Sequence, residues 1–154
     1  MKQGFVKVAA ASCAVVVADV RENTRVILET IHKMEDEGAK VMVLPELALT
    51  GYTCSDLFWQ SQMIDAAKEG LKEIADGTKE TDALIFVGLP WEQGGKLFNV
   101  AAVLCHGELL GVVPKKYLPN YNEFYEQRHF SSGEDVWDEI TIGEESVPFG
   151  SSLI

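Results

Sequence analysis

Two ionisable residues follow strand-like segments of this sequence, and the first of them is Glu46. The apolar run Val41-Met42-Val43-Leu44 precedes Pro45 and Glu46, and Pro45 favours an end to the strand because it restricts the residue before it. A carboxylate at the carboxyl end of a buried strand lies where α/β sheets form their sites, and it can act there as a general base. A solvated loop glutamate is the alternative. The turn and aromatic ring supplied by Thr50-Gly51-Tyr52 make that alternative less attractive.

The second ionisable candidate is Lys115, which has Lys116 beside it. The pair follows the strand-like run Leu109–Val113 and Pro114, so one of the two side chains can point back into the domain. A lysine near a carboxylate can stabilise the negative charge that develops during acyl transfer. Lysines are mostly solvated, however, and the sequence pattern alone still favours two surface lysines.

A cluster of aromatic and acidic residues comes next in the chain. It either lines a polar pocket or packs as a surface loop, and its composition does not decide between the two. The cluster comprises Tyr121, Glu123, Phe124, Tyr125 and Glu126.

The cysteines and histidines show no spacing typical of a metal site or of a disulfide framework. The three cysteines are far apart and form no CxxC pair, and the three histidines are scattered, so we assign no metal ligand. Cys13 and Cys105 lie in apolar contexts and are expected in the core. Cys54 is close to Tyr52 in sequence, but a buried, inert thiol is the better interpretation.

The charge of the chain limits the classes of partner. A net charge of −11 and a pI near 4.6 over 154 residues argue against binding to nucleic acid, which requires clustered Lys and Arg. There is no apolar run of membrane-spanning length and no secretory signal, so we expect a cytoplasmic protein that does not bind membranes.

The elements that must position the candidates follow from hydrophobic periodicity. Val6–Ala11 is expected to be a strand, and a capping-box-like helix start at Asp19 leads into apolar residues at helical spacing that end near Gly38. The strand before Pro45 is followed by a second amphipathic helix from Met63 to Ile74 and by a strand at Ala83–Leu89. The first ninety residues therefore predict the order βαβαβ, which is typical of an α/β domain.

The second part of the chain changes character. Asn99–Cys105 and Leu109–Val113 flank a short segment with a glycine, which predicts an antiparallel hairpin. The prolines and asparagine after it predict a loop over residues 115–126. Phe149–Ile154 is expected to begin a strand.

Taken together, these segments resemble the nitrilase superfamily of carbon-nitrogen hydrolases. Leu44-Pro45-Glu46-Leu47-Ala48-Leu49-Thr50-Gly51-Tyr52 is similar to the catalytic-glutamate motif, and Pro114-Lys115-Lys116-Tyr117-Leu118-Pro119 is similar to the catalytic-lysine motif. Two more specific strings resemble the glutaminase domain of glutamine-dependent NAD synthetases. They are Leu118-Pro119-Asn120-Tyr121-Asn122-Glu123-Phe124-Tyr125-Glu126 and Gly51-Tyr52-Thr53-Cys54-Ser55-Asp56-Leu57-Phe58.

The resemblance implies a role for each matched residue in a Glu-Lys-Cys triad. Glu46 matches the general base, and Lys115 matches the lysine that stabilises the tetrahedral intermediate. Tyr121 matches a position that contacts the glutamine substrate, whereas Tyr52 and Glu123 match positions that line the site. The nucleophilic cysteine of the family follows the lysine loop, and all three cysteines here precede it.

The resemblance also implies a fold and a domain organisation. The expected fold is α/β, the N-terminal half of a nitrilase-type four-layer αββα sandwich. Residues 1–154 would form a partial carbon-nitrogen hydrolase (glutaminase) domain, truncated before the nucleophile cysteine and before any synthetase domain. We therefore expect the chain to be inactive by itself.

In the intact enzyme, the resemblance implies hydrolysis of glutamine to supply ammonia for ATP-dependent synthesis of NAD from deamido-NAD. The glutaminase domain would need no cofactor, whereas ATP and magnesium would serve the synthetase domain, and a homo-oligomer is expected. Two alternatives remain open. One is a free-standing amidase of the same superfamily, and the other is a non-catalytic interaction module.

Overall fold

A mixed β-sheet with two helices on one face organises the chain. The computed structural model describes residues 4–142 and 145–151. In chain order the elements are β1 (Val8–Ala10), α1 (Val20–Asp36), β2 (Val41–Val43), the 3₁₀ helix η1 (Ser55–Trp59), α2 (Ser61–Gly77), β3 (Leu84–Gln93), β4 (Lys96–Cys105), β5 (Glu108–Pro114), α3 (Glu126–His129), β6 (Trp137–Ile142) and β7 (Glu145–Gly150).

The order of the strands follows from how they are connected. The described strands lie in the order β1-β2-β3-β4-β5-β7-β6. β1, β2 and β3 are parallel because α1 and α2 connect them, whereas β3, β4 and β5 form antiparallel pairs through short turns. The predicted βαβαβ unit and the predicted hairpin are therefore both confirmed, and the α/β class with them.

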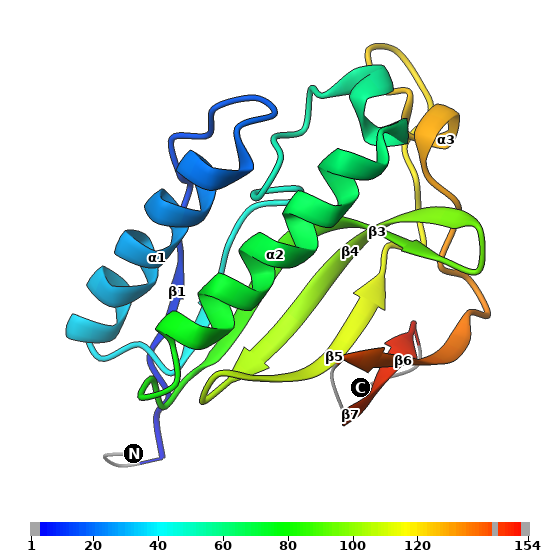
Figure 1. Cartoon of the computed structure of the whole chain (residues 1–154). Helices are drawn as coiled ribbons and strands as arrows, with labels where there is room; N and C mark the ends of the chain where they lie inside the picture. The colour runs from blue at the N-terminus through cyan, green and yellow to red at the C-terminus, as the bar shows by residue number, and fades with distance from the viewer. Residues whose placement is uncertain (1–3, 143–144, 152–154) are drawn as a thin grey trace.

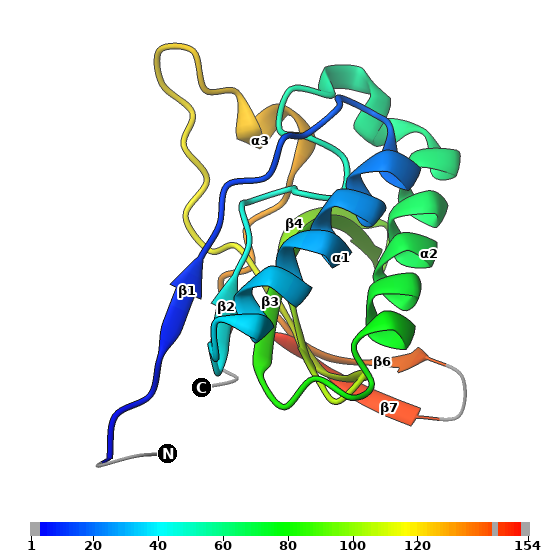
Figure 2. The same ribbon diagram turned by 90° about the vertical axis from the view of Figure 1, so that its left-hand side faces the viewer.

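Helices α1 and α2 cover one face of the sheet, as Figures 1 and 2 show. Asp19 caps α1 by accepting a hydrogen bond from the backbone N–H of Glu22 at 3.0 Å, as the capping pattern predicts. Ile27 and Ile31, on the inward face of α1, are fully buried, and α2 buries Ile74 in the same way. Burial of each such side chain contributes about 1.5–3 kcal/mol, so this layer fixes the sheet that carries the site.

The opposite face of the sheet is open and apolar. A groove with a volume of about 640 Å³ runs along it, and Val41, Val43, Phe86 and Val113 line part of it. In the side view of Figure 2 the two helices lie on the other side of the strands. Residues alternate between the two faces, so Met42 and Ile85 are buried under the helices while their neighbours Val43 and Phe86 face the groove.

The C-terminal part differs from the sequence-based expectation. A strand was expected to begin at Phe149, but Phe149 and Gly150 lie at the end of β7, and residues 152–154 lie outside the described residues. Hydrophobic periodicity did not predict the hairpin of β6 and β7, because β6 is an edge strand with the exposed acidic residues Asp138 and Glu139. Among the described residues, no helix combines the length and the apolar content needed to cross a bilayer.

Gly88 permits a close approach that shapes the end of β2. A Cβ atom at Gly88 would lie 2.4 Å from the carbonyl oxygen of Pro45 and 2.5 Å from the backbone nitrogen of Leu47. The segment after β2 therefore passes directly over β3, and Leu49 donates a backbone hydrogen bond of 3.2 Å to the Gly88 carbonyl. Only a residue without a side chain fits at this crossing.

Gly88→Ala is expected to lower the free energy of unfolding by about 1–3 kcal/mol, because the added methyl group forces the Pro45–Leu47 backbone away from β3. Urea unfolding measures the free energy, and amide chemical shifts report the displaced segment. Gly94→Ala is the control. Its φ of +58° strains an alanine, unlike the φ of Gly88, but nothing crowds its Cβ position, so any loss of stability there leaves the shifts near Leu47 unchanged. Unchanged shifts in the Gly88 variant would contradict the close approach.

Candidate active site

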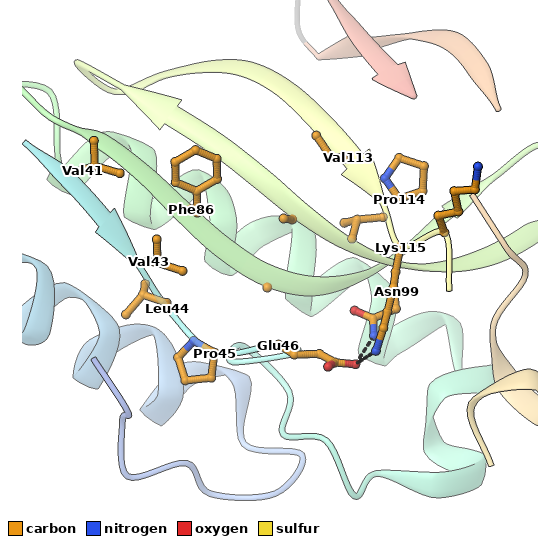
Figure 3. A pocket seen from close by; sticks show the side chains of 14 residues that line it. Val41, Val43, Leu44, Pro45, Glu46, Phe86, Asn99, Val113, Pro114 and Lys115 are labelled. Atoms are coloured by element: carbon orange, nitrogen blue, oxygen red, sulfur yellow. Dashed lines mark hydrogen bonds and ion pairs between the residues drawn. The ribbon is translucent and has the colours of Figure 1, made fainter. Parts of the chain in front are cut away.

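The site begins with Glu46, which lies in the segment that leaves β2. Leu44 extends the pairing of this segment with β3 by donating a backbone hydrogen bond of 3.0 Å to Phe86. The chain then crosses over Gly88, and the Glu46 side chain reaches along the open face of the sheet toward Asn99 and Lys115 (Figure 3). The side chain is 38% exposed, so one part of its carboxylate faces the groove.

Lys115 is the first residue after β5, and its backbone is fixed on both sides. Its N–H donates to the carbonyl of Asn99 at 2.8 Å, and its own carbonyl accepts from Gly133 at 2.9 Å. Its Nζ donates to Glu46 Oε1 at 2.8 Å and to Glu126 Oε1 at 2.9 Å. The structure thus brings the two residues of the predicted pair together.

Because both side chains must reach one reacting carbonyl, the sequence predicts that Glu46 and Lys115 lie on neighbouring strand ends, and the structure differs from this prediction. Glu46 follows β2 and Lys115 follows β5, and β3 and β4 lie between these strands. The expectation of adjacent strands was wrong, because the segment after β2 does not stop at the sheet edge. It crosses β3 at Gly88 and carries Glu46 to the β4–β5 side.

Lys115 is held as an ammonium ion. Its partial burial disfavours the charge, but hydrogen bonds and charge–charge attraction from Glu46 and Glu126 outweigh that effect and raise the pKa of Lys115 above its ordinary value. A lysine in this state donates hydrogen bonds and does not accept protons. Lys115 is therefore suited to stabilising an oxyanion, and the partly exposed carboxylate of Glu46 could act as a base.

The structure adds Glu126, to which the sequence analysis gave no role of its own. This carboxylate is only 4% exposed, and its Oε1 accepts hydrogen bonds from Lys115 Nζ and, at 2.8 Å, from the Tyr52 hydroxyl. Burial and the hydrogen bond to Glu126 raise the pKa of Tyr52, which stays a neutral donor. Local sequence does not distinguish Glu126 from Glu123, because only the turn into α3 directs Glu126 inward.

Asn99 is the second residue that the sequence analysis missed. Its side chain is buried, and its Nδ2 donates a hydrogen bond to Glu46 Oε1. A signal was present in the sequence, because Asn99 is the one amide in the apolar run from Leu97 to Cys105. Buried polar side chains need a partner, and here that partner is Glu46.

Two of the three remaining predicted site residues line a smaller cavity of about 230 Å³. Tyr52, Glu123 and Glu126 line it. Tyr121 is 63% exposed and contacts these residues through the ring of Phe124. The centroid of the Phe124 ring lies 5.6 Å from that of Tyr121 and 6.4 Å from that of Tyr52. The roles of Tyr52, Tyr121 and Glu123 toward a substrate stay predictions.

The neighbouring lysine and the cysteines do not join the cluster. Lys116 pairs with Glu134 at 2.9 Å on the surface, so Lys115 is the inward residue of the two. Cys54 is buried, its Sγ donates to the carbonyl of Thr50, and burial raises the pKa of its thiol. Among residues 4–142 and 145–151, no hydrogen bond joins a cysteine to Glu46 or Lys115, and no three potential metal ligands gather.

Comparison with known proteins identifies relatives with longer chains. The chain is 35% identical over 153 residues to the glutamine-dependent NAD(+) synthetase of Mycobacterium tuberculosis, and this match covers 99% of the chain and 22% of the relative. It is 36% identical over 119 residues to the corresponding protein of Aquifex aeolicus, covering 77% of the chain and 21% of the relative. The chain thus spans about a fifth of the length of these relatives.

Solved structures of two kinds of protein are similar in fold to this chain. A glutamine-dependent NAD(+) synthetase from Cytophaga hutchinsonii matches with a TM-score of 0.88 and 28% identity, over 94% of this chain and 25% of that one. An amidase from Nesterenkonia sp. matches with a TM-score of 0.71 and 23% identity, over 93% of this chain and 54% of the amidase, which shows a shared fold. The model of the carbon-nitrogen hydrolase family matches residues 7–149. Because this match covers nearly the whole sequence, the chain belongs to the carbon-nitrogen hydrolase family.

Proposed function

We propose that residues 1–154 are part of a glutaminase domain that hydrolyses glutamine and supplies ammonia for ATP-dependent synthesis of NAD from deamido-NAD. The contact of Lys115 with both Glu46 and Glu126 supports the hydrolytic chemistry most strongly. The synthetase assignment is supported by similarity to glutamine-dependent NAD(+) synthetases along 99% of the chain. The nucleophile, the synthetase domain and its ATP and magnesium are assigned to parts of the protein outside these residues.

The proposed reaction divides its steps among three groups. A cysteine thiol supplied by another part of the protein gives its proton to Glu46, and its sulfur attacks the side-chain amide carbon of glutamine. The Lys115 ammonium stabilises the negative oxygen of the tetrahedral intermediate. The carbon–nitrogen bond then breaks, and ammonia leaves with the proton held by Glu46. This step leaves a thioester, and water that gives its proton to Glu46 attacks its carbon. The carbon–sulfur bond breaks, the sulfur takes back the proton from Glu46, and glutamate is released.

In the full-length protein, Glu46→Gln and Lys115→Met are each expected to lower glutamine-dependent NAD synthesis by about 100-fold or more, because one variant removes the base and the other the oxyanion donor. Synthesis from free ammonium should persist, since a separate domain performs it. Both rates are measured with deamido-NAD and ATP.

Lys116→Met is the matched control for these variants, because Lys116 contacts Glu134 on the surface and not the cluster. It should retain both activities. Equal loss of both activities in the Glu46 and Lys115 variants would assign these residues a structural role. A wild-type protein that hydrolyses an amide but makes no NAD from either nitrogen source would favour the free-standing amidase.

Glu126→Gln is expected to shift the pH dependence of glutamine hydrolysis on its alkaline side. Glu126 is one of the two carboxylates that raise the pKa of Lys115, so removal of its charge lowers that pKa and the ammonium is lost at lower pH. The alkaline limb of the pH–rate profile should therefore move to lower pH. Glu134→Gln, which changes the carboxylate beside Lys116, should leave the limb in place. An unmoved limb in the Glu126 variant would refute this coupling.

Residues 1–154 alone are expected to release no ammonia from glutamine, because groups that act as a unit lose nearly all activity without the nucleophile. Cys54 should also react slowly with a thiol reagent in the folded chain, since it is 2% exposed and its thiol pKa is raised. An assay of ammonia release tests the first expectation, and the rate of thiol labelling tests the second. Hydrolysis by the short chain that survives Cys13→Ala and Cys54→Ala would refute the cysteine mechanism.

A further inference from the structure

Asn99 lies between the two residues of the proposed catalytic pair and contacts both of them. Its side-chain Nδ2 donates to Glu46 Oε1, and its main-chain carbonyl accepts the N–H of Lys115 at 2.8 Å. The first contact fixes the carboxylate, and the second fixes the backbone that carries the ammonium. One residue of β4 therefore sets the position of Glu46 relative to Lys115.

The surroundings of Asn99 make it a rigid reference point. It is 3% exposed and lies within β4, which pairs with β3 on one side and β5 on the other. Glu46, in contrast, lies outside any strand, has three rotatable side-chain bonds and is 38% exposed. A buried amide on a central strand can thus hold a partly exposed carboxylate in one orientation.

The direction of the hydrogen bond from Asn99 follows from chemistry. An ionised carboxylate only accepts hydrogen bonds, so the NH₂ group of Asn99 must face Glu46. Oε1 of Glu46 then receives two donors, from Asn99 and Lys115, whereas no hydrogen bond to Oε2 occurs in the described part of the chain. The lone pairs of Oε1 are engaged, and Oε2 is the oxygen that remains available to a proton.

We propose that Asn99 is a positioning residue that anchors Glu46 Oε1 and leaves Oε2 to take the proton of the nucleophile. This inference rests on the proposed glutaminase function and deepens it by assigning the base to one atom. An amide suits this role because it donates without a charge, so it orients the carboxylate without adding a second cation beside Lys115. Asn99 touches neither nucleophile nor substrate in this scheme and acts through Glu46.

The test uses the full-length protein with Asn99→Leu, Asn99→Asp and Asn99→Ser. Leu and Asp nearly preserve the shape of the side chain but remove the donor, and a misplaced base costs about 100-fold in rate. The kcat for glutamine hydrolysis should therefore fall by about 10- to 100-fold in both variants, while KM for glutamine changes by less than about threefold. Ser leaves room for a bridging water and should retain more activity than Leu.

Leu104→Val is the matched control on the same strand. Leu104 is fully buried in β4, and loss of one methylene weakens the fold without touching the cluster. Its kcat per folded molecule should equal that of the wild type. Ammonium-dependent NAD synthesis should be unchanged in every variant, and thermal unfolding gives the folded fraction.

The outcomes separate this inference from the function on which it rests. If the wild type hydrolyses glutamine and the folded Asn99 variants keep its kcat, the role of Asn99 is overturned and the glutaminase proposal stands. A rise in KM at constant kcat, or equal loss of glutamine- and ammonium-dependent synthesis, also overturns it. If the wild type makes NAD from ammonium but hydrolyses no glutamine, the proposed function fails, and the role of Asn99 fails with it.

Discussion

The site depends on one ammonium group shared by two carboxylates. Lys115 lies 2.8 Å from Glu46 and 2.9 Å from Glu126, and these three side chains come from the ends of β2 and β5 and from the start of α3. Two negative charges around one positive charge keep Lys115 protonated. In the proposed reaction this state separates the functions of the two groups, because the lysine can only donate and Glu46 is the proton acceptor.

Backbone packing brings these charges together. Gly88 lets the segment after β2 cross β3, and the carbonyl of Asn99 holds Lys115 next to β4. Glu126 is brought in by α3, and the Tyr52 hydroxyl bonds the same oxygen that Lys115 contacts. This carboxylate is shielded from solvent and has two donors on one oxygen. Its charge raises the pKa of Lys115, and its fixed position restrains the Lys115 side chain.

The sequence was sufficient for the parts of the fold that follow local rules. The cap at Asp19, the helical spacing of Ile27 and Ile31, and the glycine-containing turn before β5 each predict an element that the structure contains. The family resemblance singled out Glu46 and Lys115 and gave their order. It did not single out Asn99 or Glu126, because their roles arise from contacts between residues 53 and 11 positions apart. The lone amide in the apolar run of β4 indicates a buried polar group but does not indicate its partner.

The protonation state of Lys115 is the central claim, and nitrogen NMR of its Nζ as a function of pH tests it most directly. A protonated lysine between Glu46 and Glu126 should titrate with a midpoint above 10.5, the ordinary lysine value, and its signal should persist as a hydrogen-bonded ammonium. A midpoint at or below 10.5 would show that the two carboxylates do not hold the proton on Lys115, and it would contradict this account of the site.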